Sequence, residues 1–346
     1  MATGQHFDVI IIGTGAGGGT LAHRLAPTGK RVLLLERGDY LPRERDTTHD
    51  SACIRCDRVD GFPCLIGAKS DSQVICVDPA LQHDNVTLVR NAFVRRLDTD
   101  ASGRTVTRVQ ATVGDHEQVD YTADLVVVAA GAVNSAVLLL RSASDTHPNG
   151  LGNSSGVVGR HYMRHNNRAL MAVSKEPNHT RFQKTLALTT GTTDPTTGSC
   201  RSAGIQMLGK SDTEQIRANV TVAKDDTVHL SLDEKNNVEG VKRLRAKLQG
   251  MLSDLGMEEH LHHHNIYLHK GMPIGATAHQ SGTVRFGTDP ESSALDVNCK
   301  AHDLDNLYVA DTSFFPSIGA VNPSLTAIAN AMRVGDHLIE RMGRPT

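Results

Sequence analysis

The 346-residue chain has few aromatic residues and lacks tryptophan altogether. Phe, Trp and Tyr together make up only 3% of it, which leaves few flat rings on which bases or sugars can stack. Its formal net charge is -2, so no strong positive field draws it to nucleic acid or to an anionic membrane. We therefore expect no nucleic-acid partner, and a sugar site here would depend mainly on hydrogen bonds.

Long apolar runs are also missing from the sequence. No stretch of about 18 apolar residues occurs, which is the length that a membrane-spanning helix needs. The N-terminus enters a strand-like run without the basic, apolar and small-residue pattern of a secretory signal. We therefore expect a cytoplasmic protein with no membrane association.

Cysteine is too scarce and too scattered for a small disulfide scaffold, since there are six in the chain. The CxxC pair at 53–56 with Cys64 resembles part of a metal site, which Cys76 or His49 could complete, but no second ligand pair accompanies it. We favour structural or weakly redox-active thiols. The run HLHHH at 260–264 cannot turn all of its histidines toward one ion, so we predict no specific metal site.

The strongest pattern lies in the first forty residues. The apolar run 8–12 predicts a strand, the glycines of 13–18 a tight turn, and the apolar spacing of 20–25 a helix. The segment KRVLLLE at 30–36 predicts a second buried parallel strand. This order of strand, glycine turn, helix and strand is typical of a βαβ unit that binds a dinucleotide.

Four residues of this unit are of the types that a dinucleotide requires. Gly13 allows the turn, Gly15 lets the backbone approach the pyrophosphate, and Gly18 lets helix and strand pack closely. Glu36 closes the second strand and can accept hydrogen bonds from the ribose hydroxyls. We therefore favour dinucleotide binding over a glycine turn that merely packs, although this motif alone does not separate NAD from FAD.

Further patterns follow along the chain. Residues 85–113 alternate apolar and polar side chains about a DASG turn, which predicts antiparallel strands. The run ADLVVVAA at 123–130 predicts a buried strand, followed by a small-residue turn and a helix, and residues 241–252 have an amphipathic helical pattern. Residues 306–317 predict a strand with a turn. The last helix then follows, with Pro323 in its first turn.

Three of these segments together resemble the glucose-methanol-choline (GMC) oxidoreductases, a family of flavoproteins. The tail TAHQSGTVRFGTDP at 277–290, with residues 295–342, is similar to the family's C-terminal signature, and LVVVAAGAVNSAVLLLRSA at 125–143 to an internal motif. The glycine loop matches the family's N-terminal motif. Separated motifs in the family's order are far more specific than any single one. The resemblance covers roughly residues 5–40, 84–165 and 265–346.

The resemblance implies that the cofactor is FAD. The residues matched to the ADP half and the phosphates are Gly13, Gly15, Gly18, Glu36, Val94 beside the adenine, Ala130 and Gly131. Asp311 matches the acid that meets the ribityl chain, and the helix from Pro323 would direct its N-terminus toward the flavin ring. His279 matches the family's catalytic histidine, and Asn322 matches the second member of the active-site pair.

These residue types suit the oxidation of an alcohol. A neutral His279 can take the hydroxyl proton as a hydride passes to the flavin. The amide of Asn322 can orient the alkoxide without competing for the proton, although a plain N-cap role is the alternative. The resemblance therefore implies an FAD-dependent alcohol oxidase or dehydrogenase acting on a small-molecule alcohol. The tail GAVNPSLTA at 319–327 resembles members that act on sugars and glycosides, which implies a secondary hydroxyl of such a compound. Oxygen or another electron acceptor would reoxidise the flavin, and the sequence indicates no oligomeric state.

The chain also departs from the family pattern. Between the first βαβ unit and the segment CIRCDRVDGFPCLIGAK at 53–69, the family's glycine-rich segment along the flavin has no counterpart, and the region 161–260 is short. A non-catalytic or weakly FAD-binding scaffold therefore stays open as an alternative, as does a hydroxynitrile lyase whose flavin is redox-silent. A plain NAD dehydrogenase would leave the C-terminal motifs without a purpose.

The expected fold class is α/β, with a Rossmann-like FAD-binding domain and a smaller α+β substrate domain. We assign residues 1–46, 75–160 and 270–346 to the FAD-binding domain, residues 161–269 to a reduced substrate-binding domain, and residues 47–74 to a Cys-containing connector. The substrate domain is thus predicted to be an insertion between two pieces of the FAD-binding domain.

Overall fold

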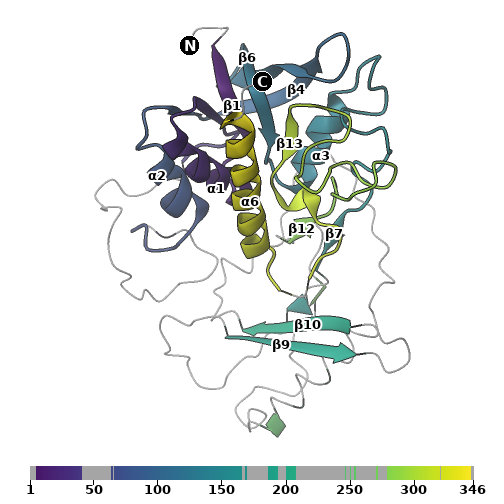
Figure 1. Ribbon diagram of the computed structural model, residues 1–346. Coiled ribbons are helices and arrows are strands. Elements are labelled where there is room, and N and C mark those ends of the chain that lie inside the picture. The colour runs from purple at the N-terminus through teal and green to yellow at the C-terminus, as the bar shows by residue number, and fades with distance from the viewer. Residues whose placement is uncertain are drawn as a thin grey trace.

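The computed structural model describes residues 5–40, 64, 66–165, 168–169, 186–193, 200–207, 246, 250, 253–254, 270–271, 279–319 and 321–343. Its main body is a seven-stranded sheet flanked by helices (Figure 1). The helices α1 (Ala16–Leu25) and α6 (Ser324–Gly343) pack side by side on the near side of this sheet in Figure 1. The predicted α/β fold class is confirmed.

The first βαβ unit forms as its apolar pattern predicts. The strands β1 (His6–Ile12) and β2 (Val32–Leu35) pair in parallel, from Val9 opposite Val32 to Ile12 opposite Leu35. Every residue of these paired runs is at most 5% exposed, which is why both read as continuous apolar runs rather than alternating ones. The 3-10 turn η1 (Ala26–Thr28) joins α1 to β2.

The helix α1 begins at Ala16 rather than at Thr20, so the expected glycine turn is shorter than predicted. Glycine disfavours a helix interior, but here tertiary contact decides. A Cβ atom on Gly17 would lie 1.7 Å from the carbonyl oxygen of Ala310, and one on Gly18 would lie 2.0 Å from that of Gly13. Only residues without side chains let the first helical turn approach the backbone so closely.

Five parallel strands place their carboxyl ends along one edge of the sheet. Besides β1 and β2 they are β3 (Val86–Val89), β6 (Glu117–Val128) and β13 (Leu307–Val309). The carboxyl-terminal half of β6 lies between β1 and β13, and β3 pairs with β2. Segments from both ends of the chain therefore meet where a ligand of a parallel α/β sheet binds.

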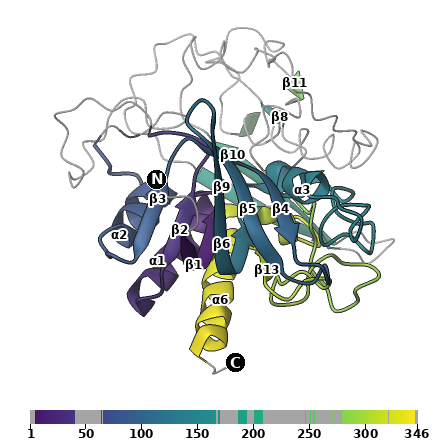
Figure 2. The same ribbon diagram turned by 90° about the horizontal axis from the view of Figure 1, so that it is seen from above.

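The expected antiparallel strands are also present. The strands β4 (Ala92–Thr99) and β5 (Val106–Val113) pair from Ala92 opposite Val113, and β5 pairs with the amino-terminal half of β6. Figure 2 shows β4, β5 and β6 side by side. The register of β4 shifts between Val94 and Arg96, as at a β-bulge.

The remaining helices connect and cover this sheet. The helix α3 (Ala132–Arg141) follows β6, and the 3-10 turn η5 (Thr312–Phe314) follows β13. A π-helical turn, η2 (Gln73–Val77), and the short helix α2 (Asp78–Ala80) lead into β3. The helix α6 begins at Ser324, one residue after the predicted start at Pro323, and the small Gly335 of α6 lets it pack against Leu21 of α1.

Three short antiparallel pairs lie outside the main sheet. They are β7 (Met163–Arg164) with β12 (Gln280–Ser281), β8 (Arg168–Ala169) with β11 (Lys270–Gly271), and β9 (Leu186–Thr193) with β10 (Cys200–Met207). All but β12 and β11 fall in the region assigned to the substrate domain, whose limits stay a prediction.

Several predicted features fall where the structure gives little description. Of the helix predicted over 241–252, residues 246 and 250 are described, and both are helical. The CxxC pair at 53–56 and the histidine run at 260–264 lie outside the described residues. Within the described ranges, no cluster of side chains could hold a metal ion, and no helix is long and apolar enough to span a membrane.

Candidate functional site

The glycine loop between β1 and α1 is held by backbone packing. Gly13 has a φ of +106°, its N–H donates to the carbonyl of Leu35 at 2.8 Å, and a Cβ atom on it would lie 2.4 Å from the carbonyl oxygen of Ala129. Gly15 caps the helix with open space around it, since a Cβ atom there would meet no described atom within 4 Å. The loop is therefore closed toward the sheet at Gly13 and open toward the edge at Gly15.

Glu36 lies directly after β2 and fixes this loop from the side. Its Oε2 accepts from the backbone N–H of Thr14 at 3.0 Å and from the Thr14 hydroxyl at 2.7 Å, and its Oε1 accepts from the N–H of Gly38 at 2.8 Å. A carboxylate has about four lone-pair sites, so these three bonds leave one for a further donor. Glu36 can thus hold the loop and still accept from a ribose hydroxyl.

The start of β4 lies beside Glu36. The N–H of Ala92 donates to the carbonyl of Glu36 at 2.8 Å, and the N–H of Asn91 donates to the carbonyl of Gly38 at 3.1 Å. Val94 follows two residues later in β4 and is 7% exposed. The structure therefore brings the predicted adenine-side strand to the residue predicted to meet the ribose.

A second glycine, Gly131, leaves open space in the turn that follows β6. Gly131 has a φ of +84° and caps α3, and a Cβ atom on it would meet no described atom within 4 Å. The preceding N–H of Ala130 donates to the hydroxyl of Ser135 at 3.1 Å. Ala130 and Gly131 thus form a tight turn onto a helix N-terminus, as the phosphate side of a dinucleotide site requires.

Asp311 ties the end of β13 to this turn. Its Oδ2 accepts from the N–H of Gly131 at 2.8 Å and from the hydroxyl of Ser135, while its Oδ1 accepts from the N–H of Ser313 at 2.8 Å and from the Ser313 hydroxyl. Asp311 is only 6% exposed. Burial raises the pKa of Asp311, and these hydrogen bonds oppose the rise. The side chain thus clamps two turns together at the edge.

These features fit the ADP half of a dinucleotide. Gly15 and Gly131 leave room for a ligand to approach the backbone, while the other glycines of the loop face protein atoms. Within residues 16–19, the first turn of α1 carries no acidic side chain, and the first N–H groups of a helix have no partners inside it. An open helix N-terminus of this kind binds phosphate.

Two histidines meet beside the same edge. The strand pair β7–β12 sets Arg164 opposite Gln280, so the next residues outward, His165 and His279, face each other. Their Nδ1 atoms are 2.7 Å apart, and their rings stand at 86°. The Nε2 atom of His165 is hydrogen-bonded to the carbonyl oxygen of Gly319. Three segments far apart in the sequence therefore converge on His279.

Contacts within the fold hold His279 close to Asp311. The hydroxyl of Thr312 donates to the carbonyl of Gln280 at 2.7 Å, and the N–H of Gly282 donates to the carbonyl of Thr312 at 3.1 Å. Burial lowers the pKa of His279, and the neighbouring His165 lowers it further. Both effects favour the neutral form of the imidazole.

Asn322 and Pro323 lie on the segment that reaches His165. Gly319, the partner of His165, lies shortly before them, and Pro323 is buried at the start of α6. Asn322 is exposed, directly before the helix. The segment that carries Asn322 is therefore linked to His279 through His165.

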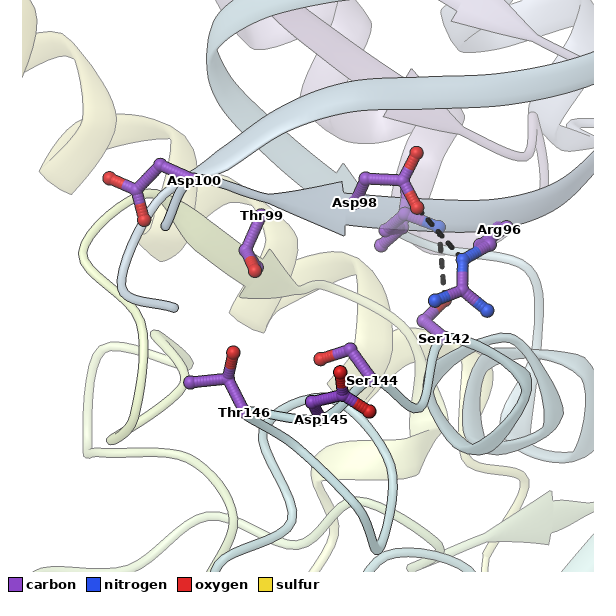
Figure 3. Close-up of a pocket in the computed structure, with 9 residues that line it drawn as sticks. Arg96, Asp98, Thr99, Asp100, Ser142, Ser144, Asp145 and Thr146 are labelled. Carbon is purple, nitrogen blue, oxygen red and sulfur yellow. Dashed lines mark hydrogen bonds and ion pairs between the residues drawn. The ribbon is translucent and has the colours of Figure 1, made fainter. Parts of the chain in front are cut away.

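A separate cavity of about 220 Å³ lies between the end of β4 and the chain after α3 (Figure 3). Figure 3 shows Arg96 and Asp98 of its wall joined by an ion pair, with Nε and Oδ1 2.8 Å apart, and Arg96 also donates to the carbonyl of Ala143 at 2.7 Å. This cavity is at the opposite end of α3 from Gly131, and a helix of that length spans about 15 Å. Gly131 and the residues around it therefore lie away from this cavity.

Several residues of the site were not predicted from the sequence. They are Thr14, Ser72, Ser135, His165, Ser313 and Gly319. Ser135 and Ser313 follow predicted residues closely, but nothing local indicates that their hydroxyls turn to Asp311. Ser72 lies in the predicted connector, yet its hydroxyl donates to the carbonyls of Thr14 at 2.7 Å and Gly15 at 2.9 Å. For His165 the sequence offers no signal other than its residue type.

Most of the chain matches the sequence profiles of one protein family. Two profiles of GMC oxidoreductases match residues 39–167 and 205–331, which together make up most of the chain. A profile of NAD(P)-binding Rossmann-like domains matches residues 11–58. These matches agree with the resemblance drawn from the glycine loop, the internal motif and the C-terminal tail.

Several characterised oxidoreductases are similar in sequence to most of this chain. A 6'''-hydroxyparomomycin C oxidase of Streptomyces lividus is 28% identical over 357 residues, covering 92% of this chain and 62% of that protein. A paromamine 6'-oxidase of Streptomyces fradiae is 27% identical over 393 residues, covering 95% and 69%. The large subunit of a fructose dehydrogenase of Gluconobacter japonicus is 25% identical, covering 73% and 54%. The chain thus spans less than two thirds of the first and third of these proteins.

Solved structures share the fold at low sequence identity. A variant formate oxidase of Aspergillus oryzae, described by its FAD modification, has a TM-score of 0.65 at 14% identity and covers 99% of both chains. A pyridoxine 4-oxidase from Mesorbium loti has a TM-score of 0.60 at 15% identity, covering 96% of this chain and 99% of the other. These likenesses support the fold described above.

Proposed function

The chain belongs to the GMC oxidoreductase family, and from this premise we propose that it oxidises an alcohol to a carbonyl compound with FAD as its cofactor. Flavin binding is the property of the family that the open glycine loop and Glu36 fit. The substrate is a small-molecule alcohol, and the electrons pass on to an acceptor, which is oxygen or another oxidant.

The observation that carries the proposal is the place of His279 beside the carboxyl edge of the parallel sheet. Its strand β12 is bonded to the turn that follows β13, through Thr312. The same edge has open space at Gly15 and Gly131, which supports a cofactor site there. A neutral imidazole next to a dinucleotide site is the arrangement that alcohol oxidation needs.

We assign the proton-transfer role to the side chains of this edge. When bound at this edge, the flavin would supply the redox chemistry, as the acceptor of the hydride from the carbinol carbon. His279 takes the hydroxyl proton on Nε2, because its Nδ1 is already engaged by His165. The amide of Asn322 donates to the alkoxide oxygen and steadies its charge as the carbonyl bond forms.

The substrate class is proposed from the relatives and from composition. Two relatives are named as oxidases of 6'''-hydroxyparomomycin C and of paromamine, and one as a fructose dehydrogenase, so we propose a hydroxyl of a sugar or glycoside as the reacting group. Within that class, the secondary hydroxyl that the resemblance of the tail implies remains a prediction. With aromatic residues at 3% of the chain, specificity would rest on hydrogen bonds to the other hydroxyls.

The first experiment is a visible absorption spectrum of the purified protein with and without added FAD, followed by an anaerobic panel of alcohols. The panel contains paromamine, fructose, a methyl glycoside and a long-chain alcohol. We expect bands near about 370 and 450 nm, the usual absorption of oxidised flavin, that bleach with a sugar-type alcohol. Bleaching shows that the two electrons have left the substrate.

Other outcomes decide between the remaining alternatives. A flavin that binds but never bleaches, in a protein that cleaves hydroxynitriles, would establish the lyase instead. A colourless protein that takes up no FAD would establish a scaffold without cofactor. Bleaching by the long-chain alcohol alone would keep the reaction but overturn the sugar assignment.

A further inference from the structure

The bond between His165 and Gly319 fixes where one proton lies. A carbonyl oxygen only accepts, so the Nε2 atom of His165 must carry the hydrogen that joins it to Gly319. A neutral imidazole carries one hydrogen, and the Nδ1 atom of His165 therefore has a lone pair. It is this lone pair that faces His279.

The short contact between the rings then fixes a second proton. The Nδ1 atoms of His165 and His279 are 2.7 Å apart, a distance that requires one hydrogen between them. Since the Nδ1 atom of His165 is the acceptor, the hydrogen belongs to the Nδ1 atom of His279. The Nε2 atom of His279 is consequently the nitrogen with the free lone pair.

We propose that His165 is a positioning residue that holds His279 in the tautomer with hydrogen on Nδ1 and a basic Nε2. This inference rests on the proposed function, because a base must offer a lone pair to the hydroxyl proton of the substrate. The relay runs from His279 through His165 to the carbonyl of Gly319. In other acid–base sites, too, a hydrogen-bonded partner fixes the tautomer and orientation of the base.

The fold supplies this arrangement through strand register rather than through a local motif. His165 and His279 are neighbours because β7 and β12 pair in register, and Gly319 enters from the turn before α6. Burial and the nearby His165 lower the pKa of His279, so the neutral form of His279 is favoured. The assignment itself follows from the donor and acceptor count of two neutral rings.

Nitrogen NMR of histidine-labelled full-length protein tests the proposal without any substrate. The ring nitrogens of His279 are assigned by the signals that disappear in His279→Gln. We expect the wild type to show hydrogen on Nδ1 at neutral pH, and His165→Leu to shift His279 toward hydrogen on Nε2, the form that predominates in free histidine. Hydrogen on Nε2 of His279 in the wild type would overturn the proposal, whether or not any variant folds.

Two further variants separate positioning from simple packing. His165→Gln keeps one acceptor and one donor, so it should retain the Nδ1 tautomer, and its kcat should stay within a few-fold of wild type. His147→Leu is a matched control, because the Nε2 atom of His147 is likewise hydrogen-bonded to a carbonyl, that of Gly103 at 2.7 Å, away from His279. It should change neither the tautomer nor kcat.

Removing the His165 imidazole should also change the steady-state kinetics. We expect His165→Leu to lower kcat at least about tenfold, with a smaller change in KM, because it removes the orienter and not a substrate contact. An unchanged kcat in His165→Leu would overturn the positioning role. A wild type that oxidises no alcohol would count against the proposed function instead, and the tautomer measurement would still decide for or against His165.

Discussion

The two halves of the site are built in different ways. The glycine loop with Glu36 is shaped mainly by backbone packing, since a Cβ atom on Gly13 or Gly17 would meet the carbonyl oxygen of Ala129 or Ala310. The region around His279 is shaped by side chains from segments more than one hundred residues apart, such as His165 at a separation of 114. Close backbone packing determines the structure of the first region, and the positions of the hydrogens on the histidine rings determine the chemistry of the second. Substitutions should therefore damage folding in one region and chemistry in the other.

The largest effect should come from removing the imidazole at the second region. His279→Ala deletes the proposed base, and loss of a general base typically costs about 10²- to 10⁴-fold in rate. We expect kcat to fall by that amount while bound flavin and the unfolding midpoint change little. Stopped-flow bleaching and thermal unfolding measure the two quantities. His147→Ala, a partly buried histidine elsewhere, is the control, and wild-type turnover in His279→Ala would refute the assignment.

The first region should respond in the opposite way. Gly17→Ala brings a Cβ atom 1.7 Å from the carbonyl oxygen of Ala310, a backbone atom that cannot turn away. Overpacking of this kind costs about 3 kcal/mol or more, so we expect a much lower free energy of unfolding or no soluble protein. Chemical denaturation measures the loss.

Gly15→Ala is the matched control for that prediction. A Cβ atom there has open space, and Gly15 has a φ of -66°, which alanine adopts readily. We expect a stability loss of at most about 1 kcal/mol, from the altered helix cap. If the open space belongs to the cofactor, FAD affinity should nevertheless fall sharply. Equal stability losses in the two variants would show that backbone space does not govern this region.

These contrasts explain what the sequence could and could not predict. The pattern of 8–36 predicted a parallel unit because apolar runs and glycine positions are local signals. It misplaced the start of α1, since the contact of Gly17 with Ala310 joins segments at opposite ends of the chain. The family resemblance supplied His279 and Asp311 as site residues, and their roles stay predictions.

What the sequence did not predict is the set of partners. Asp311 is predicted to meet the cofactor, and the structure adds protein partners that the sequence did not indicate, because Gly131, Ser135 and Ser313 donate to its two oxygens. His165 was not predicted because its contact depends on the β7–β12 register, and strands of two residues leave no periodic pattern. Side-chain hydrogen bonds between distant segments are decided by the fold, and sequence spacing does not encode them.

Asp311 lies where the two regions meet, so its loss should have an intermediate effect. Asp311→Asn keeps one acceptor oxygen but turns an amide N–H₂ toward two donors, either Gly131 and Ser135 or the pair on Ser313. We expect a loss of about 2 kcal/mol in the free energy of unfolding. Ser135→Ala removes one of the donors and should cost about 1 kcal/mol. A fully stable Asp311→Asn would show that the clamp does not contribute to the fold.

The smallest effects should appear in the dependence of activity on pH. Burial and the nearby His165 lower the pKa of His279 from its ordinary value of 6.5. The base is active when neutral, so kcat/KM should stay level as the pH falls through 6.5 and should decline only below it. A pH profile with the native substrate class measures this, and an acid limb centred above 6.5 would contradict the lowered pKa.

The lowered pKa of His279 also makes the free energy of unfolding depend on pH. Because the pKa of His279 is lower in the folded protein, the unfolded chain binds this proton first as the pH falls. The stability that the neutral ring contributes is therefore complete above about 6.5 and declines as the pH falls toward the folded pKa. His161 and His337 also have lowered pKa values, so the difference in unfolding free energy between wild type and His279→Gln isolates one group. That difference should shrink as the solution is acidified, and if it grows instead, His279 is stabilised in its charged form and the relay through His165 carries an extra proton.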